Sequence, residues 1–252
     1  MANIVLAHGI LGFGSSPFHL GVNYFNGVER ELQRLGHTVI VPSVAPLGSL
    51  EYRSKQLATA IASYCPGNSD IFVIAHSMGG LDARKVICEI PAVGNRIKKL
   101  ISIAVPHFGS PVADAVLDST HVLHKSIPVW LMSALSQNAG ALQDLRTRKK
   151  MHNEDRPGVQ YMEVVCTANN SGFASPFFGL TKAIGNLSGP NDGVVTHESA
   201  CGPGREPMQY WPVDHGEAIG WPSGMFGIQA MSALFLPPKD HIDRYKRLVR
   251  LL

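Results

Sequence analysis

The sequence predicts an α/β fold of the doubly wound kind, with a mostly parallel central sheet and helices on both of its faces. Short apolar runs alternate along the 252 residues with segments whose apolar side chains recur at helical spacing. Residues 71–75 form a continuous apolar run, which is typical of a strand buried on both faces of a parallel sheet. We therefore expect one α/β domain over residues 1–252.

The predicted strands and helices alternate in chain order. Gly36 is expected to end the first helix and Pro42 the second strand. The expected strands are residues 4–7, 37–41, 71–75, 100–104, 161–166 and 209–213. The expected helices are residues 24–35, 51–64, 81–90 and 239–250.

Residues 112–150 interrupt this alternation. They contain helix-like patterns but no convincing strand, and no linker marks them as a separate domain. We expect a helical insertion, a lid or cap above the sheet. Residues 127–132 are unusually apolar for a surface insertion, so they either form a lid or acyl-binding wall or pack on the sheet as core.

Composition narrows the class of protein. With 45% hydrophobic and 16% charged residues, the chain is not generally disordered. The net charge of +3 is small, and no basic cluster interleaved with aromatic residues indicates nucleic-acid binding. The basic segment 239–250 has helical spacing and is expected to be an amphipathic surface helix, with membrane contact as the alternative.

Targeting signals and cysteine pairing leave the compartment open. The amino terminus lacks a basic leader and cleavage site, and no apolar run approaches about eighteen residues. We expect a chain that stays inside the cell, is exported without a cleaved signal, or is numbered from a trimmed form. The four cysteines lack the paired spacings of zinc sites, and their pairing stays open.

The strongest local signal is a serine between the strand 71–75 and the helix that follows it. Ser77 has small residues two positions before and after it, Ala75 and Gly79, as the crowding of a sharp nucleophile elbow requires. Such a turn projects the hydroxyl at the carboxyl edge of the sheet, beside a helix amino terminus that favours negative charge. The alternative is a tight Gly-rich turn with an ordinary capping serine. His76 cannot easily fold back onto Ser77, so we expect it to pack or orient rather than act as the base.

A nucleophilic serine needs a base and an acid that orients the base. In this kind of fold the acid and then the histidine follow the serine. His215 lies directly after the last predicted strand and is the expected base, with a solvent-exposed loop histidine as the alternative. Asp192 lies in the turn Asn191-Asp192-Gly193 and is the expected acid, although these residues also form turns in their own right. Glu198 and Glu217 are the fallback acids.

Two backbone amides should stabilise the oxyanion. Met78 follows the nucleophile and supplies the first. The loop after the first strand begins His8-Gly9-Ile10-Leu11-Gly12, and we choose the Ile10 amide as the second donor. The alternative for His8-Gly9 is a plain strand-ending turn.

Together these segments resemble the bacterial true lipases of the Pseudomonas, Burkholderia and Proteus type, which belong to the α/β-hydrolase superfamily. The resemblance implies the α/β-hydrolase fold, the triad Ser77, Asp192 and His215, and the oxyanion amides of Ile10 and Met78. Matching blocks run in family order across most of the chain: residues 4–13, 24–28, 44–46, 53–57, 75–84, 106–114, 191–195 and 214–217.

Two family features are not matched. Those lipases hold a structural calcium ion near the base, with an Asp and a Gln where this chain has Glu217 and Trp221. The second family Asp lacks an obvious counterpart between Asn169 and Asn191. We therefore expect no metal and no cofactor. The disulfide of the family is not assured by Cys166 and Cys201.

The expected function is carboxylic ester hydrolysis by a serine hydrolase, foremost a triacylglycerol lipase with an acyl-enzyme intermediate. The alternatives are a short-chain carboxylesterase or polyester depolymerase, and more remotely a catalytically silent lipid-binding protein. The partner is a small lipid or ester, with transient contact to a lipid interface if the lid moves. Candidate substrate-binding residues are Leu11, Phe13, His76, Val129, Trp130 and Met132.

Overall fold

A sheet of six parallel strands forms the centre of the molecule in the computed structural model, which describes residues 1–12, 24–65, 67–136, 139–168, 177–202, 205–221 and 240–252. The strand order is β2-β1-β3-β4-β5-β6. The chain therefore winds outward in both directions from a switch point between β1 and β3, where ligands bind in sheets of this kind. The strands are β1 (Asn3–Ala7), β2 (Thr38–Ile40), β3 (Ile71–His76), β4 (Ile97–Ile103), β5 (Gln160–Cys166) and β6 (Gln209–Trp211).

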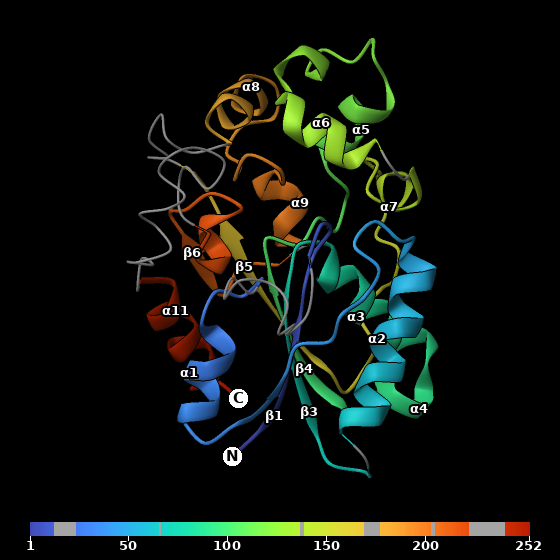
Figure 1. The fold of residues 1–252 in the computed structure, drawn as a ribbon, viewed down its shortest axis with the longest axis vertical. Helices are drawn as coiled ribbons and strands as arrows, with labels where there is room; N and C mark the ends of the chain where they lie inside the picture. Colours follow the sequence, from blue (N-terminus) through green and yellow to red (C-terminus); the bar gives the residue numbers. More distant parts are fainter. Residues whose placement is uncertain (13–23, 66, 137–138, 169–176, 203–204, 222–239) are drawn as a thin grey trace.

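Helices cover both faces of the sheet (Figure 1). One face carries α1 (Val28–Arg34) and α11 (Asp240–Val249), and the other carries α2 (Leu50–Tyr64), α3 (Met78–Glu89) and α4 (Pro91–Gly94). Alternation along β1 places Ile4 and Leu6 in the core under α1 and α11, while Val5 and Ala7 pack in the core under α2 and α3. The predicted two-faced α/β architecture is confirmed.

Residues 112–150 form helices at the end of the molecule beyond the carboxyl edge of the sheet (Figure 1). The described part of this segment contains no strand, as expected. Its helices are α5 (Pro111–Leu117), η1 (His124–Ser126), α6 (Val129–Leu135) and α7 (Ala139–Asp144). The described part of the chain also contains α8 (Phe178–Ser188), α9 (His197–Cys201) and η2 (Glu217–Ile219). Whether the insertion moves as a lid stays a prediction.

The ends of several elements differ from expectation. The strand predicted at 209–213 stops at Trp211, because Pro212 has no N–H for the ladder. The helix predicted at 81–90 begins at Met78, directly after Ser77, so the turn is as sharp as an elbow requires. The loop after β1 is described only as far as Gly12.

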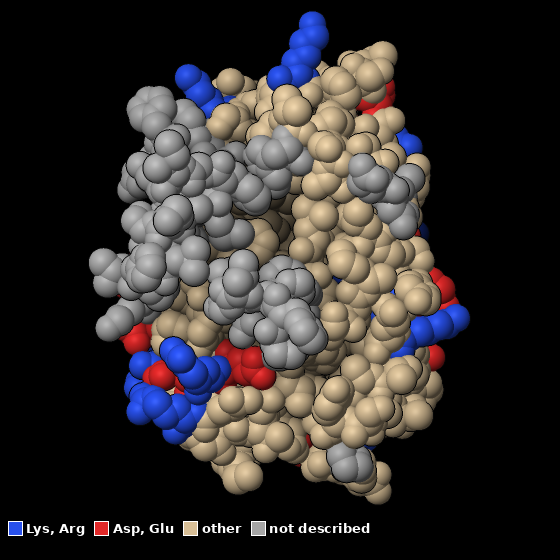
Figure 2. All heavy atoms as spheres, viewed as in Figure 1, with Lys and Arg blue, Asp and Glu red and all other residues tan. Residues whose placement is uncertain are grey.

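The carboxy-terminal helix has the amphipathic character expected of it. His241, Tyr245 and Leu248 of α11 are buried, while Lys246 forms ion pairs with Glu31 of α1 and with Asp243. Figure 2 shows charged side chains gathered over these two helices. No described helix is long and apolar enough to cross a membrane. All four cysteines are free thiols in the structure.

The contact of α3 with Val105, in the loop after β4, predicts that Gly80→Ala destabilises the protein. A Cβ at Gly80 would lie 2.2 Å from Cγ2 of Val105, so the core would be overpacked by about 1–3 kcal/mol. The matched control is Gly179→Ala in α8, where a Cβ meets no atom within 4 Å and helix propensity adds at most about 1 kcal/mol. Urea unfolding measures both, and equal stabilities for the two variants would contradict this packing.

Candidate active site

Ser77 occupies the sharp turn between β3 and α3 with φ 55° and ψ −136°. Such a backbone conformation costs a non-glycine residue roughly 1–3 kcal/mol and persists only where its surroundings impose it. Ser77 stands at the amino-terminal cap of α3 but makes no side-chain capping hydrogen bond. The alternative of an ordinary capping serine therefore does not describe this residue, whose hydroxyl is left for another use.

Glycines allow the backbone to approach Ser77 from both sides. A Cβ at Gly9 would lie 2.7 Å from the Ser77 Cβ, so the loop after β1 passes against the serine. A Cβ at Gly79 would lie 2.3 Å from the carbonyl oxygen of Ala7. Any side chain at these two positions would separate β1 from the turn.

His215 and Asp192 form a buried hydrogen-bonded pair. His215 Nδ1 lies 2.7 Å from Asp192 Oδ2, and the main-chain N–H of His215 donates to the Asp192 carbonyl at 2.9 Å. Asp192 is 1% exposed and His215 is 9% exposed. His215 is thus not a solvent-exposed loop histidine, and its Nδ1 is oriented by a carboxylate as a general base requires.

Backbone amides hold the acid in its turn. Asp192 Oδ1 accepts hydrogen bonds from the N–H groups of Val194 and Val195, at 2.9 and 2.7 Å. The Ser110 hydroxyl donates to the Val194 carbonyl, so the loop after β4 also holds this turn in place. Of the fallback acids, Glu198 is exposed, and Glu217 is bound to the main chain of Asp214.

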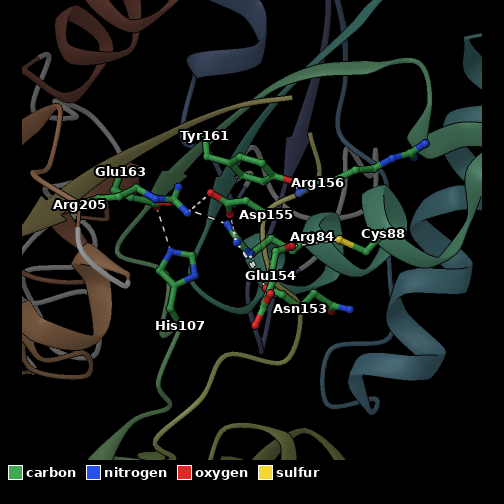
Figure 3. Close-up of polar contacts among 10 residues, drawn as sticks. All are labelled: Arg84, Cys88, His107, Asn153, Glu154, Asp155, Arg156, Tyr161, Glu163 and Arg205. Atoms are coloured by element: carbon green, nitrogen blue, oxygen red, sulfur yellow. Dashed lines mark hydrogen bonds and ion pairs between the residues drawn. The ribbon is translucent and has the colours of Figure 1, made fainter. Parts of the chain in front are cut away.

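A buried ionic network lies behind this loop (Figure 3). Glu163 of β5 accepts from His107 Nε2 at 2.9 Å and from Arg205 Nη1 at 3.2 Å, and Arg84 Nη1 lies 4.0 Å from the same carboxylate. Because its Nε2 hydrogen-bonds to Glu163, His107 is occupied in this network. The network ties the loops after β4 and before β6 to α3 and β5.

The outer half of the network is formed by Asp155 and Tyr161. Asp155 pairs with both Arg84 and Arg205. The Tyr161 ring lies under both guanidinium groups, at 4.6 and 5.3 Å (Figure 3). Buried charges need such pairing to avoid an uncompensated desolvation cost.

The loop after β1 is fixed by His8. Val44 N–H donates to His8 Nε2 at 3.2 Å, so Nδ1 carries the proton and donates to the Gly9 carbonyl at 2.9 Å. Burial, with the nearby Arg53 charge, lowers the pKa of His8 to about 4. Neutral His8 therefore holds the loop through two hydrogen bonds of its ring. A plain strand-ending turn would not have these side-chain bonds.

Arg53 of α2 supports the same loop from beneath. Its guanidinium is fully buried and donates to the carbonyls of His8 and Ala45, both at 2.8 Å. It also pairs with Asp82 of α3 through Nε and Nη2, at 2.9 and 2.7 Å. One ion pair thus joins the loop after β1 to the helix that begins at Ser77.

These constraints place the expected oxyanion donors around Ser77. Leu11 N–H donates to the Pro46 carbonyl at 2.9 Å, and Ile10, one residue earlier, lines the cavity above the serine. Met78 is the first residue of α3, and the N–H groups of a first helical turn have no acceptor within the helix. The oxyanion roles of Ile10 and Met78 stay predictions.

A cavity that is partly open to solvent lies over these residues. Ser77, His76 and His215 form its floor, and the remaining lining is largely apolar. Four leucines of the insertion contribute to the wall, namely Leu131, Leu135, Leu142 and Leu145. Part of the apolar segment 127–132 thus forms a cavity wall and also packs in the core.

The predicted substrate-binding residues are only partly at the cavity. Leu11 and His76 line it. Val129 is 85% exposed and, like Met132, is not among the lining residues, because α6 turns Leu131 and Leu135 inward instead. Phe13 lies outside the described residues, and so does the side chain of Trp130. Val129 and Met132 therefore lie away from this cavity, and their role in substrate binding stays a prediction.

The loop that carries His215 does not fit the calcium site of the resembled lipases. The Asp214 N–H donates to Glu217 Oε2, and the Glu217 N–H donates to Asp214 Oδ1, at 3.0 and 2.8 Å. Trp221 offers no oxygen and donates its indole N–H to the Tyr24 carbonyl at 3.1 Å. Among the described residues, no group of three or more His, Cys, Asp or Glu could hold a metal ion.

Three residues in contact with the site were not singled out from the sequence. Arg53 and Asp82 lie in helices, where charged residues are usually solvated. Only the structure shows that both side chains point inward and form a buried pair. Tyr24 hydrogen-bonds to His76 Nδ1 through its hydroxyl at 2.8 Å. Its place in the matching block 24–28 was the one available signal.

Comparisons with known proteins agree with this architecture. A family model described as a PGAP1-like alpha/beta domain matches residues 48–150. The mature Bacillus licheniformis lipase BlEst2 superposes with a TM-score of 0.69 at 21% identity, covering 93% of this chain and 91% of that one. Staphylococcus hyicus lipase superposes with a TM-score of 0.64 at 17% identity, covering 98% and 96%. The chain therefore has the α/β-hydrolase fold.

Sequence relatives carry the name triacylglycerol lipase. Triacylglycerol lipase 2 of Saccharomyces cerevisiae is 29% identical over 80% of this chain and 64% of its own length. A triacylglycerol lipase of Vibrio cholerae is 33% identical over 60% of this chain and 47% of its own length. The chain thus spans about half to two thirds of the length of these relatives.

The lowered pKa of His8 predicts a loss of stability in acid. Because the unfolded histidine takes up a proton near pH 6.5 and buried His8 does so only near pH 4, the free energy of unfolding falls as pH decreases between these values. His8→Gln should flatten this slope by up to about 1.4 kcal/mol per pH unit. Urea unfolding from pH 7.5 to 4.5 measures it, and parallel slopes for the two proteins would contradict the buried neutral imidazole.

Proposed function

We propose that this protein is a serine hydrolase that cleaves carboxylic esters, and foremost a triacylglycerol lipase. The observation that carries the proposal is the buried Asp192–His215 hydrogen bond beside Ser77, whose strained turn opens into an apolar cavity. Relatives named triacylglycerol lipase support the same chemistry. A silent lipid-binding protein would need neither the strained serine nor the oriented histidine.

In the proposed reaction, Ser77 Oγ attacks the ester carbonyl carbon while His215 Nε2 takes the hydroxyl proton. The Ile10 and Met78 amides hold the resulting oxyanion, and Asp192 stabilises the imidazolium through Nδ1. The carbon–oxygen bond to the alcohol then breaks as His215 returns the proton to the departing oxygen. An acyl-enzyme remains on Ser77.

Water completes the cycle on the same residues. His215 takes a proton from the water as its oxygen attacks the acyl carbon, and the oxyanion forms again in the same place. The bond to Ser77 Oγ breaks and His215 returns the proton to the serine. The products are one carboxylic acid and one alcohol, and no metal or cofactor enters any step.

The cavity wall supports a lipophilic acyl group. Four leucines from α6, α7 and the turn after α7 line the wall beyond Ser77, so each buried methylene of a chain gains about 0.8 kcal/mol. On the outer side of the insertion, Val129 is 85% exposed and Val122 is 69% exposed. These exposed side chains support a transient contact with a lipid–water interface.

Hydrolysis of p-nitrophenyl esters of increasing chain length, soluble and emulsified, tests the proposal. The wild type is expected to prefer medium or long chains and emulsified ester, and Ser77→Ala should lose activity by at least about 10⁴-fold. Ser110→Ala, which keeps the triad side chains, is the milder comparison, because it removes the bond to the Val194 carbonyl and the side-chain cap of α5. A preference for acetyl esters would favour the carboxylesterase or polyester depolymerase. Full activity in Ser77→Ala would refute the mechanism.

A further inference from the structure

Tyr24 touches three separate segments of the site. Its hydroxyl hydrogen-bonds to His76 Nδ1, directly before Ser77, at 2.8 Å. A Cβ at Gly9 would lie 2.6 Å from the same hydroxyl oxygen, so the loop after β1 passes against it. Its main-chain carbonyl accepts the indole N–H of Trp221, at the end of the loop that carries His215.

The Tyr24–Trp221 contact combines a hydrogen bond with aromatic packing. The rings meet edge to face with centroids 5.6 Å apart, a geometry worth about 0.5–1.5 kcal/mol beyond the area buried. Beside it, Asn26 Nδ2 donates to the Gly220 carbonyl at 2.8 Å, and His241 Nε2 lies 2.6 Å from the Asn26 carbonyl. The main-chain N–H of Trp221 donates to the Gly216 carbonyl at 3.0 Å and so closes the loop.

The position of His215 depends on two contacts of Tyr24, one with His76 and one with Trp221. The His215 ring lies 4.5 Å, centroid to centroid, from His76, which Tyr24 holds in place. The loop from His215 to Trp221 ends against Tyr24 and Asn26. A shift of about 1 Å in a reacting group can cost on the order of 10²-fold in rate. Fixing this loop therefore bears on turnover as well as on stability.

We propose that Tyr24 and Trp221 are positioning residues that hold the His215 loop against the nucleophile strand. The Trp221 indole N–H, at the position where the resembled lipases have a Gln, donates directly to the Tyr24 carbonyl. The carboxylates of Asp214 and Glu217 each accept a hydrogen bond from the main-chain N–H of the other residue. Within the described part of the chain, these hydrogen bonds fasten the loop, and this inference rests on the proposed function.

The test compares Trp221→Phe and Tyr24→Phe with Trp211→Phe. The first two keep an aromatic ring but remove the indole N–H or the hydroxyl. Trp211 also donates its indole N–H, to Gln209, but lies in the core away from the cavity. Both Trp221→Phe and Tyr24→Phe should lower kcat about 10- to 100-fold with KM nearly unchanged, while Trp211→Phe keeps kcat.

A second readout does not depend on activity. The proton between His215 Nδ1 and Asp192 should give a low-field proton resonance in the wild type and in Trp211→Phe. That resonance should broaden or disappear in Trp221→Phe, because the loop loses its anchor. If Trp221→Phe does not unfold cooperatively, Asn26→Ala, which removes the bond to Gly220, provides the same comparison.

The outcomes separate the two proposals. A wild type that hydrolyses no ester would refute the proposed function, and the resonance would still decide the role of Trp221. Folded Trp221→Phe with wild-type kcat and an unchanged resonance would overturn the positioning role. So would a kcat that falls with EDTA and recovers with calcium chloride, since the loop would then depend on a metal. The expected result is that neither addition changes kcat or the melting temperature.

Discussion

The backbone of Ser77, with its positive φ at the end of β3, is the conformation on which the arrangement of the site depends. A strained residue is held only where the surrounding structure over-determines it. Here the Ser77 N–H continues the ladder to the Ile103 carbonyl, and its own carbonyl accepts from Gly80 in the first turn of α3. The strand on one side and the helix on the other leave the residue little freedom.

The topology brings the remaining groups to the same edge. β1 and β3 are neighbours at the switch point, so the loop that follows β1 lies against the turn that follows β3. The acid turn and the base loop arrive from the β5 and β6 side, and the Asp192–His215 bond joins them. Buried polar pairs then fix each loop separately: Arg53–Asp82 beneath the first, and Glu163–His107 behind the acid turn.

Much of this arrangement could be predicted from local signals. The apolar run before Ser77 indicated a buried strand, and the small residues around the serine indicated a turn too tight for larger ones. Chain order and the end of the last strand then singled out Asp192 and His215. The structure brings Asp192 and His215 together as expected, because these expectations depend on residues adjacent in sequence or on the direction of parallel strands.

Other features depend on tertiary contacts that the sequence does not reveal locally. The short helix α6 has apolar residues on several sides, and packing turned Leu131 inward and Val129 outward. Arg53 is buried because two carbonyls and Asp82 surround it, although charged helix residues are usually solvated. In the sequence, Trp221 indicated only a missing metal ligand, because its contact partner Tyr24 lies 197 residues away.

The central claim is that Ser77 is a nucleophile activated by His215. Incubation with an alkyl p-nitrophenyl phosphonate, followed by peptide mass spectrometry, tests it most directly. We expect one phosphonyl group per chain, on the peptide that contains Ser77, and no labelling after His215→Ala. Labelling of a different residue, or equal labelling of Ser77 without His215, would contradict it.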